Sequence, residues 1–238
     1  MATKHLVATL GAALISIGSV VVSSVAVVGP AAADNPQIPG ASTVQCAVGV
    51  DSSGSSITCA AATAGAATSV ACDSVEAISR NGSVYTLFPH TCRGTISGIG
   101  TADATFDGDT PLTIDSATGA VNAVHTQSFT GQWSENGNTV RGRCAGSVLS
   151  ETLAPFTASI GNAWCTATLD VLGVGTATVT GTGSTLRVVT APHVAVTLTG
   201  PDLALTSSTA LLGPVAATCA TSVGLNPATI PPVSAMVC

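Results

Sequence analysis

The stretch VHTQSFTGQWSENGNTVRGRCAGSVL, residues 124–149, decides the fold class of this chain. Asn136-Gly137 stands at its middle, and this dipeptide favours a two-residue type I′ turn between antiparallel strands. On one face, which is mainly apolar, the turn pairs Trp133 with Val140, Phe129 with Cys144 and His125 with Val148. On the other, polar face it pairs Gln132 with Arg141, Thr130 with Arg143 and Thr126 with Ser147. Because one face is apolar, burial specifies the register, and the stretch predicts an antiparallel hairpin.

Alternation of apolar residues with threonine and serine continues along most of the chain, which is typical of half-buried strands. Two further turns are predicted: Asn81-Gly82, and the segment 115–119, which joins strands at 112–114 and 120–124. Strands are also expected at 163–180 and 186–198. Only 60–67 and 208–217 have a helix-like composition. The expected fold is therefore all-β: one or more antiparallel β-sandwiches, immunoglobulin-like in general architecture only.

The N-terminus has the three parts of a secretory signal peptide. Lys4 precedes an apolar run at 6–28, which leads into Ala31-Ala32-Ala33. We expect a signal helix within residues 1–33, cleavage between Ala33 and Asp34, and a secreted β domain over 34–238 that allows a subdivision near 115–125. An uncleaved membrane anchor at 6–28 is the alternative, because this run approaches the length that spans a bilayer. No second long apolar run follows, so no membrane insertion is expected after cleavage.

Composition limits the partners of the exported chain. Removing the leader removes the only lysine, so five arginines remain against twelve acidic residues. Such a chain is poorly suited to neutralise phosphates, which argues against nucleic acids and anionic membranes as partners. Aromatic residues are 3% of the chain, so the core must rely on small aliphatic side chains that each bury little area.

The cysteines offer a compensation for this thin core. All eight follow the leader: Cys46, Cys59, Cys72, Cys92, Cys144, Cys165, Cys219 and Cys238. An exported chain with an even cysteine count favours disulfides over metal ligation, and each closed loop can add about 3 kcal/mol. Many connectivities are allowed, and local spacing favours Cys46–Cys59, Cys72–Cys92, Cys144–Cys165 and Cys219–Cys238.

A histidine-based site is the first candidate chemistry. The mature chain contains His90, His125 and His193 with many serines and aspartates, but no G-x-S-x-G nucleophile motif. A triad needs three groups that converge in space, which spacing alone does not establish. His125 falls on the apolar face of its predicted hairpin, where a hydrogen-bonded core or rim histidine is the plainer interpretation.

Two charged clusters supply weaker candidates. Asp103, Asp107, Asp109 and Asp115 could hold Ca²⁺, but their spacing departs from an EF-hand, and turn formation explains these aspartates more simply. Arg141 and Arg143 are two residues apart, so their side chains share one face of the predicted strand and could bind an anion. A solvated strand face is the simpler interpretation. No nucleotide or zinc-protease motif is present, and no cofactor is expected.

These observations predict a secreted, acidic, disulfide-stabilised β protein without catalytic activity. It would bind an unidentified protein or envelope component, or contribute to a structure at the cell envelope, with its oligomeric state open. The alternatives are a secreted hydrolase that uses one of the histidines, and a membrane-tethered envelope protein. An enzyme should gather histidine and acid in one concave pocket, whereas a binding module should show an exposed apolar patch or an open sheet edge.

Overall fold

Antiparallel strands account for nearly all of the described chain. The computed structural model describes residues 44–63, 66–74, 78–153, 156–190, 193–209, 213–228 and 233–235, and these ranges contain strands and turns but no helix. The strands are β1 (Val44–Asp51), β2 (Gly54–Thr63), β3 (Ala66–Ser74), β4 (Ser79–Asn81), β5 (Val84–Leu87), β6 (Pro89–Ile96), β7 (Gly100–Thr105), β8 (Leu112–Asp115), β9 (Ala120–Glu135), β10 (Asn138–Leu153), β11 (Phe156–Val171), β12 (Gly175–Val189), β13 (Ala195–Thr209), β14 (Gly213–Leu225) and β15 (Val233–Ala235).

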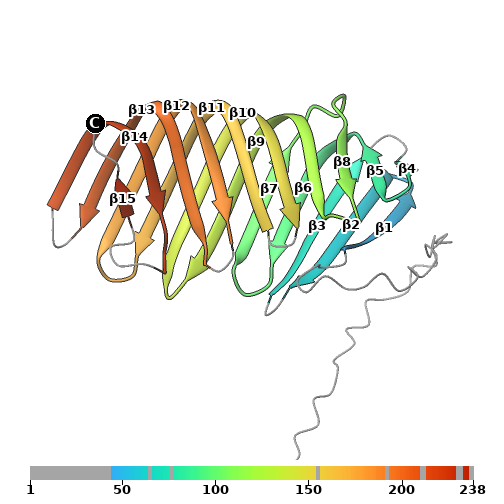
Figure 1. The fold of residues 1–238 in the computed structure, drawn as a ribbon, viewed down its shortest axis with the longest axis horizontal. Coiled ribbons are helices and arrows are strands. Elements are labelled where there is room, and N and C mark those ends of the chain that lie inside the picture. The colour runs from blue at the N-terminus through green and yellow to red at the C-terminus, as the bar shows by residue number, and fades with distance from the viewer. Residues whose placement is uncertain are drawn as a thin grey trace, which may run out of the picture.

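All of these strands belong to one hydrogen-bonded sheet. Its main order is β1-β2-β3-β6-β7-β9-β10-β11-β12-β13-β14-β15, and β4, β5 and β8 form a branch that joins β9. Figure 1 shows the strands following one another along the long axis, from β1 at one end to β14 and β15 at the other. β9 pairs with β7, β8 and β10, so hydrogen bonding is continuous through the segment near 115–125.

A row of bulges crosses the long strands at mid-length. Gly146 in β10, Asn162 in β11 and Gly183 in β12 all have positive φ, and the ladder registers shift beside each of them. Each bulge adds one residue, so the buried positions change parity within a strand: Val140 and Cys144 are buried before the bulge of β10, and Leu149 and Leu153 after it. The bulges bend the strands while the same face of the sheet stays apolar.

The bend brings the two ends of the long strands together. Glu135, at one end of β9, bonds to His193 beside the start of β13, and Asn138 bonds to Pro227 beyond the end of β14. Glu135 and Asn138 flank one turn, whereas His193 and Pro227 lie at the opposite ends of the paired strands. The single sheet therefore folds over into two facing layers, with the core between them.

The core fills the space between these layers with aliphatic side chains and few rings. Trp133 and Phe129 stack with ring centroids 6.4 Å apart, and both are almost completely buried. A Cβ added to Gly142 would lie 3.2 Å from Leu186, which belongs to the facing layer. The small residues thus let the two backbones approach closely across the core.

Three disulfides join strands that are already neighbours. Cys46–Cys59 links β1 to β2, Cys72–Cys92 links β3 to β6, and Cys144–Cys165 links β10 to β11. These pairings confirm three of the four that local spacing favours. The fourth, Cys219–Cys238, lies outside the described side chains.

The central hairpin is confirmed from its turn as far as Cys144, but two of its predicted pairs beyond that point lie on the wrong faces: Thr126 and Ser147 are buried, and Val148 is exposed and does not pair with His125. The ladder pairs Trp133 with Val140, Phe129 with Cys144 and Thr126 with Ser147, and both Asn136 and Gly137 have the positive φ of a type I′ turn. The apolar-face placement of His125 is wrong, because the bulge between Ser147 and Leu149 shifts the register and leaves His125 exposed.

The first hairpin also differs from its prediction. Arg80 pairs with Tyr85 and Asn81 with Val84, so the turn residues are Gly82-Ser83 rather than Asn81-Gly82. Gly82 has positive φ, while Asn81 remains in the strand, and the Arg80 guanidinium donates to the Gly82 carbonyl and lies 5.2 Å from the centroid of the Tyr85 ring. Asn-Gly favours a turn at Asn81-Gly82, but the hairpin adopts a register with the turn at Gly82-Ser83. In this register Arg80 contacts both Gly82 and Tyr85.

Other expectations are confirmed only in coarse form. The antiparallel all-β class holds, and the described parts of 60–67 and 208–217 are strands instead of helices. An immunoglobulin-like architecture is not confirmed, since immunoglobulin strands divide between two separate sheets whereas these strands form one. The expected leader, with its signal helix, lies outside the described residues. Within the described ranges, no helix has the length and hydropathy to cross a membrane.

Candidate functional site

Two of the candidate histidines lie beside the same loop. The loop at 106–110 leaves β7, and the amide of Phe106 donates to the carbonyl of His90 at 2.9 Å. A Cβ on Gly108 would lie 2.4 Å from the His90 ring, so this imidazole rests against the loop backbone. Hydrogen bonds from Thr110 lower the pKa of Asp107, and His125 adds a smaller electrostatic effect in the same direction. His90 and His125 are exposed, and neither lines the cavity between the layers.

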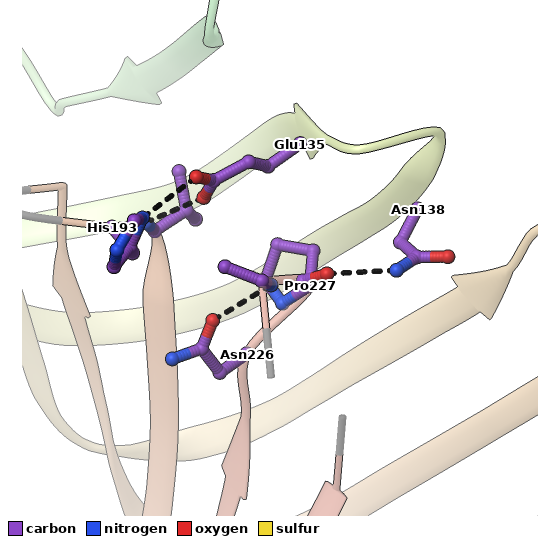
Figure 2. Close-up of polar contacts among 7 residues, drawn as sticks. Glu135, Asn138, His193, Asn226 and Pro227 are labelled. Atoms are coloured by element: carbon purple, nitrogen blue, oxygen red, sulfur yellow. Dashed lines mark hydrogen bonds and ion pairs between the residues drawn. The ribbon is translucent and has the colours of Figure 1, made fainter. Parts of the chain in front are cut away.

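The third histidine, His193, joins two strand ends that the bend brings together. His193 Nδ1 lies 2.8 Å from Glu135 Oε1, and Glu135 Oε2 accepts from the Val194 amide at 3.2 Å. Beside them, the Asn138 side chain donates to the Pro227 carbonyl at 2.7 Å and accepts from the Leu172 amide. We call Glu135, Asn138, His193 and Pro227 the clasp; Figure 2 shows its contacts from Glu135 to His193 and from Asn138 to Pro227. Its geometry gives His193 a structural role.

The four aspartates do not form a shared site. Asp103 pairs with Arg93 across β6 and β7 at 2.6 Å. Asp107 accepts from the amides of Asp109 and Thr110, and Asp115 accepts from the Ala117 amide at 2.9 Å. Bonds of this kind stabilise turns, and each keeps its carboxylate at its own loop or strand. Among the described residues, no group of three or more histidine, cysteine or acidic side chains is placed to hold a metal ion.

Arg141 and Arg143 lie on the exposed face of β10, as the hairpin pattern indicates. Arg141 forms an ion pair with Asp170 on β11. An anion that binds Arg141 would have to compete with the Asp170 carboxylate. The two arginines are therefore best described as part of a solvated strand face.

Sequence analysis missed one unusual group, the carboxyl of Glu151. Glu151 is 7% exposed, and its Oε1 atom has no hydrogen-bond partner within the described structure. It borders a cavity of about 10 Å³ lined by residues of β3 and of β6 to β11. This volume is close to the smallest that holds a water molecule. The alternation Leu149-Glu151-Leu153 was a usable signal, because it places an acid in an apolar row.

Edge strand β1 is the strongest candidate for an interaction site. Its even-numbered residues face inward with Ile57 and Cys59 of β2, yet the burial of this row decreases along the strand. Val44 is 7% exposed, Val48 is 40% exposed and Val50 is 64% exposed. The facing layer thus leaves the end of the row uncovered, and two neighbouring valines meet solvent at the edge of the sheet.

The backbone of β1 is open on the same side. Cys46 and Cys59 are register partners with Cα atoms 4.0 Å apart, the close spacing of a non-hydrogen-bonded antiparallel pair. Because the two kinds of pair alternate, Val44, Val48 and Val50 share this geometry, so their amides and carbonyls point away from β2. Within the described chain, β2 is the only hydrogen-bonded partner of β1. The strand therefore presents both apolar side chains and unpaired backbone groups.

The remaining described edges are better protected. β4 and β15 each contain three residues, β4 carries Arg80, and β14 begins with Gly213-Pro214. Short strands, charged side chains and proline all discourage the addition of another strand. β1 has eight residues, and from Val44 to Val50 it contains neither charge nor proline. Comparison with protein-family models, curated proteins and solved structures finds no match to this chain.

Proposed function

We propose that this protein is an exported, non-catalytic module that binds a partner or assembles through the open edge of β1. The observation that carries the proposal is the coincidence of exposed Val48 and Val50 with outward-pointing backbone groups. Addition of a strand satisfies those groups, and the valines supply apolar contact beside them. The three disulfides favour an oxidising, extracellular setting.

The residues around the histidines favour this module over the alternative of a secreted hydrolase. A hydrolytic site needs a base, its orienting group and a nucleophile around one concave space. The imidazoles of His90 and His125 are exposed, and His193 is engaged in the clasp. In the described structure, the carboxyl that faces the cavity between the layers belongs to Glu151, and the side chains around it are mainly apolar.

Site-specific photo-crosslinking in the producing cell tests the proposal. A photoreactive residue replaces Val48 in one variant and Val148, which is 50% exposed on an internal strand, in the control. We expect a discrete adduct from position 48 and none from position 148. Absence of an adduct at position 48, or equal labelling from both positions, would contradict binding through β1.

A further inference from the structure

We propose that the partner of β1 is a second copy of this chain, paired antiparallel along the same edge so that two sheets become one. This inference rests on the proposed function, since it names the partner of the same edge. It depends on the side-chain row, the charge and the backbone pattern of β1.

The inward row of β1 is complementary to itself. When Ala47 of one copy faces Ala47 of the other, Val44 lies opposite Val50 and Cys46 lies opposite Val48 in both directions. Each exposed valine then gains an apolar cross-strand neighbour on its own face of the sheet. On the outer face, Gln45 lies opposite Gly49, so no bulky pair is forced together.

Charge selects the antiparallel orientation. Asp51 is the one charged residue of β1, and its carboxylate accepts from the amide and hydroxyl of Ser53. These hydrogen bonds lower the pKa of Asp51, so it stays ionised at neutral pH. In the antiparallel arrangement the two Asp51 carboxylates lie at opposite ends of the paired segment. Parallel pairing in the same register would place them side by side, where like charges repel.

The backbone pattern matches the same register. The outward amides and carbonyls belong to Val44, Cys46, Val48 and Val50, and the register places these residues opposite one another in the two copies. Each such pair can exchange hydrogen bonds in both directions. The Cys46–Cys59 disulfide holds β1 on the sheet before association, which reduces the entropy lost when the edge is ordered.

Light scattering after size-exclusion chromatography tests the inference on the oxidised mature chain, residues 34–238, with two matched variants. V48K places a lysine at the proposed contact, and V148K makes the same change at an exposed valine away from any sheet edge. We expect a dimer for the wild type and V148K. For V48K we expect a dissociation constant raised by about 100-fold, because a lysine replaces a contact valine in each copy.

A second substitution separates pairing from misfolding. V48P removes an outward N–H while leaving the bonds of Ala47 and Gly49 to β2, and it also should weaken the dimer. Circular dichroism and thermal unfolding establish that each variant is folded. A monomeric wild type, or a dimer that survives V48K and V48P, would overturn self-pairing. An adduct at position 48 with a different protein would also overturn it while leaving the binding function of β1 in place.

Discussion

At the scale of single residues, Glu151 is the side chain least suited to its surroundings. Burial raises the pKa of its carboxyl to about 8 from an ordinary 4.5. Asp103 is the other acidic residue beside the same cavity, but its carboxylate is paired with Arg93 and turned away from Glu151. Its partner Arg93 is exposed on the outer face. Burial therefore keeps Glu151 protonated at neutral pH, and the described residues that line the cavity include no cation to oppose this effect.

This placement predicts a pH-dependent stability. Between pH 4.5 and 8 the folded chain retains a proton that the unfolded chain releases, so the free energy of unfolding falls as pH rises. The slope reaches about 1.4 kcal/mol per pH unit within that window. Urea denaturation at pH 5, 6.5 and 8 measures it in the wild type and in E151Q. We expect the slope to disappear in E151Q, and an equal slope in both proteins would refute the assignment.

Gly131 provides a second test at this scale. A Cβ added there would lie 1.9 Å from the Trp133 ring, which is fully buried and stacked near Phe129. We expect G131A to displace the ring and to cost about 1–3 kcal/mol of stability. At Gly161 the added Cβ meets Thr185 at 3.6 Å, so G161A is the matched control. Thermal unfolding followed by tryptophan fluorescence measures both, and equal losses would contradict the contact.

At the scale of elements, the bulge row determines how a simple series of hairpins becomes two layers. The strands of the central hairpin were predictable, because threonine and valine alternate and because Asn136-Gly137 marks its turn. The predicted strands at 163–180 and 186–198 are wrong in their bounds, since the first runs across the turn between β11 and β12 and the second across the break between β12 and β13. The bend was not predictable, since its signal is a change of parity around Gly146, Asn162 and Gly183. The sequence-based prediction continued the alternation of the hairpin past Gly146 without a change of parity. It therefore placed His125 on the wrong face. A single inserted residue is enough to reverse every later position.

Asn162 tests the importance of this row. Its φ of 59° lies in the left-handed region, which asparagine tolerates and β-branched residues avoid. We expect N162V to reduce stability by about 1–2 kcal/mol, whereas N162G should be neutral or slightly stabilising. Chemical denaturation of the two variants gives the comparison. Equal stability of N162V and wild type would show that the bend does not require this conformation.

The disulfides differ in their accessibility. Cys144 and Cys165 are fully buried, whereas Cys46 is half-buried at the open edge. Limited reduction, alkylation and peptide mass spectrometry should therefore detect Cys46 and Cys59 as the first modified cysteines. The same mass analysis should show a chain that starts at Asp34 with no alkylatable thiol before reduction. Earlier modification of Cys144 and Cys165 would contradict the buried placement of their bond.

At the scale of the whole molecule, sequence alone indicated the class of the fold and three disulfides but not the candidate site. Val48 and Val50 belong to an apolar row that looks inward-facing, and only the position of the facing layer leaves them exposed. The placement of His90 and His125 beside the loop at 106–110, and the contact of His193 with Glu135, likewise depend on segments distant in the chain. Local patterns specify strands and neighbouring pairs, while exposure depends on where the folded sheet ends.

Amide hydrogen exchange along β1, measured by NMR on the protein recovered from the producing cells, tests the central claim most directly. The amides of Ala47 and Gly49 point toward β2 and serve as internal references, whereas those of Val48 and Val50 point outward. Strand addition predicts slow exchange at all four positions, with Val48 and Val50 as protected as their neighbours. Fast exchange at Val48 and Val50, beside slow exchange at Ala47 and Gly49, would contradict the account, because the edge would then be open in the native protein.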